Sequence, residues 1–470
     1  MPEFRSWFQC ANPECGRSYP LNEVLYKCPR CDDGSKRAGL LEVRHDMGAL
    51  SAVPAREWKE LFDSRYLRTT WPYGSGVWGK KEWVCPMVAD ENIVSAYEGG
   101  SNLFWANRFG HELGLDDLWV KLCGNSHSGS FKDLGMTVLV SMVNQMIAEG
   151  KPIQAVACAS TGDTSAALAM YGAAARIPVI VLLPESKVSI PQLIQPIANG
   201  AITLAVDTDF DGCMQLVSEL CSSGEIYLAN SMNSLRLEGQ KTIAFEMIQQ
   251  FDWQPIDWVI VPVGNCGNIT AISKGFLMLK QLGLLDRLPR LVGAQAAHAN
   301  PLADLYRRGY PDEPFVPMKA RNTLANAIQI GDPVNLWKAI EVLKQMPDHS
   351  ILDVTEDELA DAAAWADRGG LFCCPQTGVA LGALLQLVRE GRIRRGERVV
   401  VISTANGLKF PSFKLWYHAG GEGEAPVDEA RPAPANPRFR NTPFRCAPNL
   451  DSVRHAIDTG IQRLNAIQLG

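Results

Sequence analysis

The regular alternation of short apolar runs with helical patterns constrains the fold of this chain more than any other feature. It extends from residue 116 to residue 415. Strands are expected at 155–159, 179–183 and 201–206, and helices at 164–176 and 190–199. Alternation at this spacing is typical of βαβ units, whose strands lie parallel. The sequence therefore predicts an α/β protein built on open, mostly parallel sheets.

Length and composition exclude several classes of protein. At 470 residues the chain can bury a large core, and we expect at least two lobes. The 51 acidic residues exceed the 45 Lys and Arg, which argues against nucleic acid as a partner. No stretch approaches the ~18 consecutive apolar residues of a membrane span. The first residues lack the pattern of a signal or transit peptide, so we expect a cytoplasmic protein with no membrane partner.

Lys132 is the candidate nucleophile. It lies in the run NSHSGSFKDLGM (125–136), shortly after Gly129 and Ser130 and before apolar residues with helical spacing. This pattern predicts an amine at the start of a helix, beside a loop hinged by glycine. A partly desolvated amine held near a carbonyl is reactive, as in Schiff-base lysines. The alternative is an ordinary solvated lysine.

The run VPVGNCGNI (261–269) is a candidate anion site. It follows an expected strand at 258–261 and precedes an expected helix at 270–282. Small residues at such a junction let backbone N–H groups converge on an anion at the helix N-terminus. The patterns of nucleotide triphosphatases and of dinucleotide-binding proteins are both absent. We therefore expect a cradle for one phosphate, or else a plain turn, formed by Gly264, Asn265, Cys266, Gly267 and Asn268.

A third segment, VVVISTANG (399–407), is an expected strand with hydroxyl residues at its carboxyl end, where α/β proteins place ligands. A reactive lysine, a one-phosphate cradle and the Thr404 hydroxyl together indicate pyridoxal phosphate (PLP). Lys132 would bond to the cofactor, the cradle would hold its phosphate, and Thr404 would meet the pyridine nitrogen. A neutral partner leaves that nitrogen largely unprotonated, which disfavours transamination.

Five ordered motifs resemble those of the threonine synthases: SGSFKD (128–133), ASTGDTS (159–165), NSMNSLRLEGQKT (230–242), GNCGN (264–268) and STANGLKF (403–410). The plant-type branch is the most similar, through residues 71–78 and 299–302. The resemblance implies a tryptophan-synthase-like (fold type II) PLP enzyme, with two open lobes of mostly parallel sheet and the cofactor between them.

The same resemblance implies the activity. Threonine synthases convert O-phospho-L-homoserine and water to L-threonine and phosphate, the last step of threonine biosynthesis. They do so through a PLP Schiff base, here on Lys132, and are carbon–oxygen lyases acting on a phosphate ester. Once released from the cofactor, Lys132 is the natural base for the substrate Cα–H, because it is already held within reach.

The resemblance also assigns substrate-binding residues. Ser160, Thr161 and Thr164 would receive the substrate carboxylate, and Asp163 would reach the ring oxygen of the cofactor. Members of the family often have Asn where this chain has Asp163, and a carboxylate there repels a phenolate oxygen. The alternative is that Asp163 and Thr164 only cap the helix that follows.

Asn230, Ser231 and Arg236 would bind the substrate phosphate. A guanidinium fork suits that role because it binds phosphate through two parallel hydrogen bonds. The alternative for Arg236 is a surface ion pair.

We expect four parts along the chain. Residues 1–46 form a Cys-rich, zinc-ribbon-like segment, and residues 47–130 with 237–418 form the large PLP-binding lobe. Residues 131–236 form a smaller, mobile lobe. Residues 419–470 form a Pro-rich extension that ends in a helix expected over 450–464.

The N-terminal cysteines form a candidate metal site. Cys10 and Cys15 are separated by four residues, and Cys28 and Cys31 by two. Four thiols in two close pairs suit tetrahedral Zn²⁺ with a structural role, and a metal-free remnant is the alternative. Most of the other cysteines lie singly in apolar runs, as reduced core residues do.

The residues alone leave other functions open. A related fold type II lyase, such as a cysteate synthase or a threonine deaminase, would share the motifs, although a deaminase has no need of the second phosphate site. A ligand-sensing relative without catalysis would require Lys132 to form no bond with PLP. By resemblance to the plant-type branch we expect a homodimer, with S-adenosylmethionine as candidate effector. The aromatic residues of 71–78 and 101–105 either stack an adenine or belong to the core.

Overall fold

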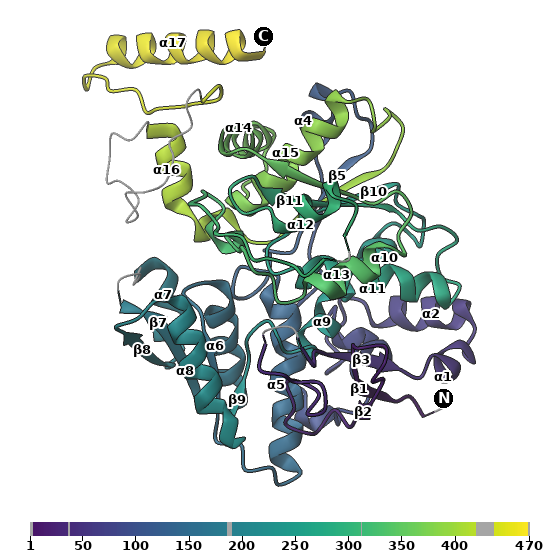
Figure 1. Cartoon of the computed structure of the whole chain (residues 1–470). Coiled ribbons are helices and arrows are strands. Elements are labelled where there is room, and N and C mark those ends of the chain that lie inside the picture. The colour runs from purple at the N-terminus through teal and green to yellow at the C-terminus, as the bar shows by residue number, and fades with distance from the viewer. Residues whose placement is uncertain (1–2, 36–37, 186–189, 312, 420–436, 469–470) are drawn as a thin grey trace.

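Two parallel sheets form the body of the molecule (Figure 1). The computed structural model describes residues 3–35, 38–185, 190–311, 313–419 and 437–468. The larger sheet has six strands in the order β12-β11-β10-β13-β5-β4, all parallel except for the antiparallel edge pair β4–β5. Its strands are β4 (Leu103–Trp105), β5 (Leu118–Leu122), β10 (Trp258–Pro262), β11 (Arg290–Ala296), β12 (Ser350–Val354) and β13 (Val399–Ser403).

The smaller sheet has four parallel strands in the order β8-β7-β6-β9. They are β6 (Ala155–Ala159), β7 (Val179–Pro184), β8 (Ile202–Val206) and β9 (Ile226–Leu228). Every residue of β6, β10 and β13 is buried. Strands covered on both faces are expected to be continuously apolar, which explains why these runs stand out in the sequence.

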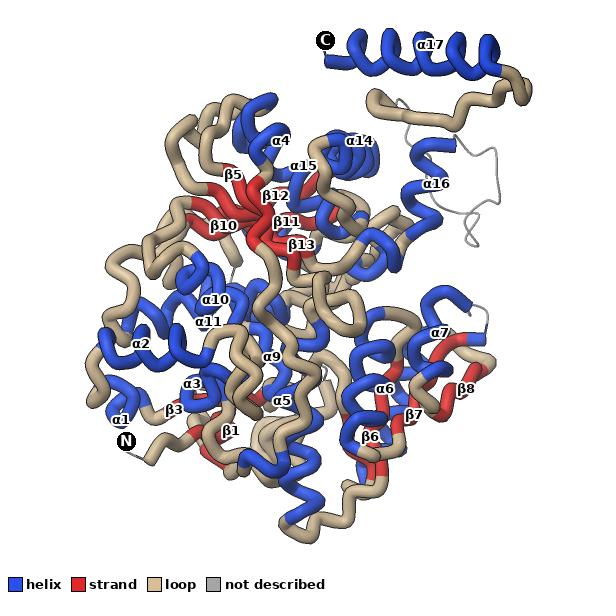
Figure 2. Tube along the Cα trace, turned by 180° about the vertical axis from the view of Figure 1, so that it is seen from behind, coloured by secondary structure: helices blue, strands red, loops and turns tan. Residues whose placement is uncertain are grey.

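Helices cover both sheets, as the view from behind also shows (Figure 2). Those nearest the small sheet are α5 (Lys132–Ala148), α6 (Asp163–Ala175), α7 (Ile190–Ala198) and α8 (Phe210–Leu220). Those of the large unit include α9 (Leu235–Gln240), α10 (Thr242–Gln250), α11 (Gly267–Gln281), α12 (Pro301–Arg307), α13 (Leu336–Leu343), α14 (Glu356–Arg368), α15 (Pro375–Arg389) and α16 (Pro411–Ala419). Shorter or peripheral helices are α1 (Met47–Ser51), α2 (Ala55–Arg65), α3 (Lys81–Val84), α4 (Asn107–Glu112) and α17 (Leu450–Gln468).

The expected elements agree with the structure to within a few residues. The strand expected at 155–159 is β6, and the helix expected at 164–176 is α6, which begins one residue earlier. The terminal helix is longer than expected, because α17 extends to Gln468. The first part of the Pro-rich extension, residues 420–436, lies outside the described residues.

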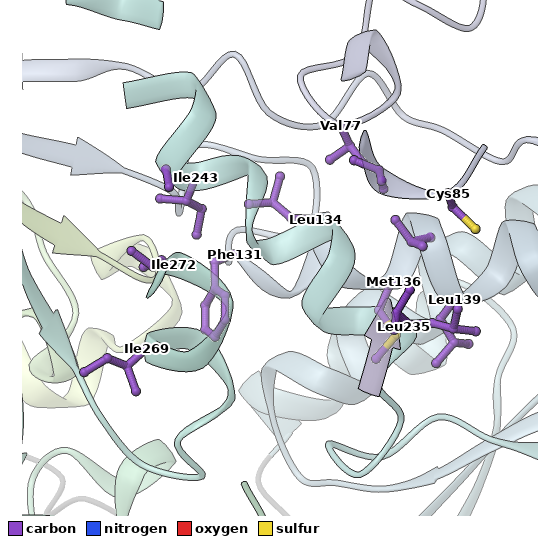
Figure 3. Close-up of a cluster of buried hydrophobic side chains, with 14 of the residues drawn as sticks. Val77, Cys85, Phe131, Leu134, Met136, Leu139, Leu235, Ile243, Ile269 and Ile272 are labelled. Atoms are coloured by element: carbon purple, nitrogen blue, oxygen red, sulfur yellow. The ribbon is translucent and has the colours of Figure 1, made fainter. Parts of the chain in front are cut away.

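The main core surrounds α5, which packs against α6 and α9. Met136 and Leu139 of α5 lie beside Leu235, and Phe131 lies near Ile269 and Ile272 (Figure 3). A helix buried on nearly all sides is hydrophobic all round. The core therefore holds the N-terminus of α5, and Lys132 with it, in a fixed position.

A three-stranded antiparallel sheet carries the N-terminal segment: β1 (Ser6–Cys10), β2 (Ser18–Tyr19) and β3 (Leu41–His45). A buried charge cluster joins it to α9. Glu238 is bonded to His45 Nε2 at 2.6 Å, to Lys241, and to Lys274 at 3.0 Å. Burial alone would raise the pKa of Glu238, but the charges of Lys241 and Lys274 hold that pKa well below its usual value. The segment is thus fixed to α9, the helix that contains Arg236.

Within the described ranges, every helix is too short or too polar to cross a bilayer.

Candidate active site

One pocket brings together every residue predicted for the cofactor and the substrate. Its volume is about 1900 Å³. It opens beyond the carboxyl ends of β6, β10 and β13, the edge at which parallel sheets place ligands. The predicted residues that line it are Lys132, Ser160, Thr161, Asp163, Thr164, Asn230, Ser231, Arg236, Gly264, Asn265, Cys266, Gly267, Asn268 and Thr404.

Lys132 is the first residue of α5, with Nζ 4.2 Å from the ring centroid of Phe131. Burial and then the positive charge of Arg236 lower the pKa of Lys132 to about 7, although Asp163 acts in the opposite direction. Near neutral pH a large fraction of this amine is therefore unprotonated. Such an amine is a competent nucleophile and base.

The loop that carries Lys132 is bonded to the loop that carries Thr404. Phe131 N donates to Thr404 O at 2.9 Å, and Asn406 N donates to Gly129 O at 2.9 Å. A β-bridge between Ser130 and Ala405 lies between these two bonds. The reactive amine and the strand-end hydroxyl thus belong to one rigid unit.

The cradle depends on an unusual backbone. Cys266 has φ +63°, in the left-handed region, and α11 begins at the next residue. A Cβ at Gly264 would lie about 3 Å from Ile328, so only glycine fits there. Asn268 is buried, and neither of its amide atoms has a hydrogen-bond partner among the described residues. Small residues at a helix N-terminus with an unsatisfied amide beside them fit a phosphate group.

The Asn265 side chain instead supports the cradle. Its Nδ2 donates to Ser231 Oγ at 3.0 Å, and its Oδ1 accepts from Val334 N at 3.1 Å. The backbone of the cradle, rather than this amide, is therefore the part that remains available to an anion.

Asp163 does not cap α6. The cap position is Gly162, which has no side chain to bond, and Asp163 is the first helical residue. The alternative that Asp163 only caps the helix is therefore wrong. Its carboxylate pairs with Lys409, Oδ1 to Nζ at 2.9 Å, so a cation balances its charge beside the pocket.

Asn230 and Arg236 have different surroundings. Asn230 exchanges two hydrogen bonds of 3.0 Å with the backbone of Ala159, so its amide holds the end of β6. Arg236 is 2% exposed, and its Nη1 donates to Ala229 O at 3.2 Å, while Nε has no partner among the described residues. Burial lowers the pKa of Arg236 to about 10, so the guanidinium remains charged at neutral pH. Arg236 therefore has donors available for an anion, and is not in a surface ion pair.

Two pocket residues were missed by the sequence predictions. Gln376 is 3% exposed, and its amide has no partner in the described part of the chain. It lies near the start of α15, next to Cys374, whose Sγ is 3.7 Å from Thr404 Oγ1. The other residue is Lys409, which stands in the motif 403–410 and could have been noted there.

The N-terminal cysteines converge on one point. The Sγ atoms of Cys10, Cys15, Cys28 and Cys31 all lie within 4.8 Å of one another. Cys15 and Cys28 are 3.8 Å apart, about the separation of two sulfurs bound tetrahedrally at roughly 2.3 Å from one zinc. Burial acts to raise the pKa of Cys28, but hydrogen bonds from Tyr19 and the backbone outweigh it and lower that pKa to about 6.

Comparisons with known proteins agree with this geometry. The sequence model of the pyridoxal-phosphate dependent enzyme family matches residues 94–405. Threonine synthase 2, chloroplastic, of Arabidopsis thaliana is 57% identical over 410 residues, which cover 87% of this chain and 78% of that protein. The threonine synthase of Methanocaldococcus jannaschii is 40% identical over 399 residues, covering 85% and 92%.

Solved structures show the same fold. Threonine synthase from Escherichia coli superposes with a TM-score of 0.62 at 21% identity, over 87% of this chain and 90% of that one. Threonine deaminase isoform 2 from Solanum lycopersicum superposes with a TM-score of 0.56 at 18% identity, over 69% and 88%. At such identities the likeness concerns the fold alone.

Proposed function

Because this chain belongs to the threonine synthases, within the pyridoxal-phosphate dependent enzymes, we propose that it converts O-phospho-L-homoserine and water to L-threonine and phosphate in the pocket around Lys132. The observation that carries the choice of substrate is Arg236. It is a buried, charged guanidinium with a free Nε, close enough to influence Lys132 and separate from the 264–268 cradle. A second anion site beside the reactive amine suits a substrate that carries its own phosphate.

PLP, when bound, supplies an aldehyde that combines with amines and a ring that withdraws electrons from the substrate Cα. The residues present would hold it at four points. Lys132 would bond covalently, the backbone of 264–268 would bind the phosphate, and Thr404 would face the ring nitrogen. Asp163, with its charge balanced by Lys409, would face the ring oxygen.

Lys132 moves the proton at the substrate Cα. With a pKa of about 7, about half of the Lys132 amine is free of its proton at neutral pH, so it can accept one from a Cα–H held beside it. The hydrogen bonds between the 129–131 and 404–406 loops keep the amine in place during this transfer. Fixed positioning of this kind is a large part of catalytic power.

Arg236 would bind the substrate phosphate and stabilise it as it leaves from Cγ. Ser231 lines the same pocket, and we assign it to the substrate phosphate. We assign three further hydroxyls of the pocket to the substrate carboxylate, those of Ser160, Thr161 and Thr164. Asn230 would act indirectly, by fixing the end of β6.

The test is an assay of the purified protein with O-phospho-L-homoserine. We expect equal amounts of phosphate and threonine. Ammonia release from threonine, without any phosphate release from O-phospho-L-homoserine, would reject the proposal and indicate a deaminase.

We also propose that Cys10, Cys15, Cys28 and Cys31 hold one structural Zn²⁺. Their mutual approach to within 4.8 Å supports a tetrahedral site of four sulfurs. We further propose a cytoplasmic location, because most cysteines outside this cluster are buried in apolar surroundings, as reduced core residues are.

We propose that the protein forms a homodimer and that S-adenosylmethionine is its effector. Trp71 and Trp105 are about half exposed, and rings of this size on a surface suit an interface, whereas Trp78 belongs to the core. Titration of S-adenosylmethionine at sub-saturating substrate tests the effector, and a flat response would reject it.

A further inference from the structure

Lys409 joins parts of the chain that are far apart in sequence. It ends the short 3₁₀ turn Gly407–Lys409, which follows the Thr404 loop. Its ammonium donates to Ser128 O at 2.9 Å and to Gln195 Oε1 at 2.9 Å, and it pairs with Asp163 Oδ1 at 2.9 Å. An ammonium has three donors, so each one has an acceptor.

The three acceptors lie on three separate segments. Ser128 belongs to the loop before Lys132, Asp163 begins α6, and Gln195 lies on α7. Gln195 Nε2 also donates to Ser128 O at 3.1 Å, so the lysine, the glutamine and this carbonyl form a closed triangle. One side chain thus connects the end of β13, in the large sheet, to two helices of the small-sheet unit.

The backbone leaves room for this lysine. Gly129 has φ +82°, and a Cβ there would lie 2.9 Å from Lys409 Cδ. A side chain at position 129 would therefore be strained and would displace the lysine stem. Glycine is therefore required at position 129, in the loop before Lys132, because the Lys409 side chain passes close to it.

The contacts also balance charge at the pocket wall. The side chains of Lys409 and Asp163 are 18% and 12% exposed, and both residues line the pocket. If Lys409 were neutral, the Asp163 carboxylate would be left without its partner in a poorly solvated place. Removing one partner of a buried ion pair is costly because the other charge remains.

We propose that Lys409 is a positioning residue, which fixes Asp163 and α7 against the reactive-lysine loop and neutralises the carboxylate that faces the ligand. This role rests on the proposed function only in taking the pocket around Lys132 as the active site. The ligand-facing group is Asp163, and Lys409 acts through it.

Amide hydrogen exchange of the full-length holoenzyme tests the connection. We expect Lys409→Met to speed exchange in α6 and α7, because their shared anchor is lost, while β10 in the large sheet keeps its protection and shows that the variant is folded. Lys414→Met is the matched control, since Lys414 pairs with Asp367 inside the large unit. It should leave exchange in α6 and α7 unchanged. Gln195→Leu should loosen α7 without changing any charge.

Kinetics of a double-mutant cycle test the charge balance. We expect Lys409→Met to lower kcat/KM by about tenfold or more, as orphaned charges do. Adding Asp163→Asn to that variant should restore part of the loss in kcat/KM, because no orphaned carboxylate remains, whereas exchange in α7 should stay fast. Strictly additive losses, or exchange in Lys409→Met equal to that of wild type, would overturn the proposal.

The exchange experiment needs no substrate. If wild type failed to form threonine while Lys409→Met still loosened α6 and α7, the proposed reaction would fall and the positioning role would stand. If wild type formed threonine normally while Lys409→Met left exchange in α6 and α7 unchanged, the proposed reaction would stand and the positioning role would fall.

Discussion

At the scale of single residues, the site depends on what burial does to charge. Burial lowers the pKa of both Lys132 and Arg236, and the positive charge of Arg236 lowers the pKa of Lys132 further. The guanidinium starts from so high a pKa that it stays charged, so the amine is the group that gives up its proton. We propose that this one buried arginine both prepares the base and binds an anion.

The first prediction concerns the pH at which Lys132 reacts. Since its pKa is about 7, the rate at which the cofactor-free protein captures PLP should rise from pH 6 to pH 8. Arg236→Met should move the midpoint upward, because it removes a positive charge, and Asp163→Asn should move it downward. Stopped-flow absorbance measures this, with Lys132→Ala as the control that forms no covalent adduct. A profile that does not depend on pH would contradict the assignment of Lys132.

The second prediction concerns the guanidinium fork. Arg236→Lys keeps the charge but loses the parallel donors, so kcat/KM for O-phospho-L-homoserine should fall about 10- to 100-fold. Inhibition by inorganic phosphate should weaken as well. Equal inhibition of wild type and variant by phosphate would place the substrate phosphate elsewhere.

At the scale of elements, the local sequence pattern was sufficient to predict a helix or strand wherever residues close in sequence are also close in space. The strand at 155–159 and the helix that follows it were predicted because buried parallel strands are continuously apolar. The role of Lys409 was not predicted, because its partners Asp163 and Gln195 come from α6 and α7. Gln376 was missed because its place in the pocket depends on the packing of α15 against β13. The N-terminal cysteines were predicted as a group, but the antiparallel sheet that brings them together was not.

The third prediction concerns the charge cluster between β3 and α9. Glu238→Gln leaves His45, Lys241 and Lys274 without their shared carboxylate, which should cost about 3–5 kcal/mol of unfolding free energy. Urea unfolding measures it. The exposed pair Arg56–Glu60 supplies the control, since Glu60→Gln should change stability little. A small effect of Glu238→Gln would mean that the cluster is hydrated.

Acid should also weaken the charge cluster between β3 and α9. Burial first, and then the charge of Lys241, lower the pKa of His45 to about 4. As the pH falls, His45 is therefore protonated at a higher pH in the unfolded chain than in the folded one. Glu238, whose pKa is also lowered, stabilises the fold above its unfolded pKa and ceases to do so in acid. Both effects have the same sign, and the free energy of unfolding should fall as the pH drops from ~6.5 toward ~4.

At the scale of the whole molecule, the Cys-rich N-terminal segment lies beside the active-site pocket, because Leu25, Lys27 and Pro29 line it. We expect about one equivalent of zinc in protein purified without chelator. Cys28→Ser should lower the melting temperature more than it changes kcat, because none of the four clustered cysteines lines the pocket. Cys446→Ser, at an exposed cysteine outside the cluster, is the control. Absence of metal, or equal melting temperatures for the two variants, would reject a structural role.

The strand order of the large sheet has a consequence for how the protein is made. The four strands of the small sheet are contiguous in the chain, from β6 to β9, and can pair while synthesis continues. In the large sheet β5 lies beside β13, which leaves the ribosome only after most of the chain. Domains tend to fold as they emerge, so the early pair β4–β5 must wait for the strand that completes its other side. Thr404 arrives with that same late strand, and so a nascent chain gains the complete cofactor pocket only near the end of its own translation.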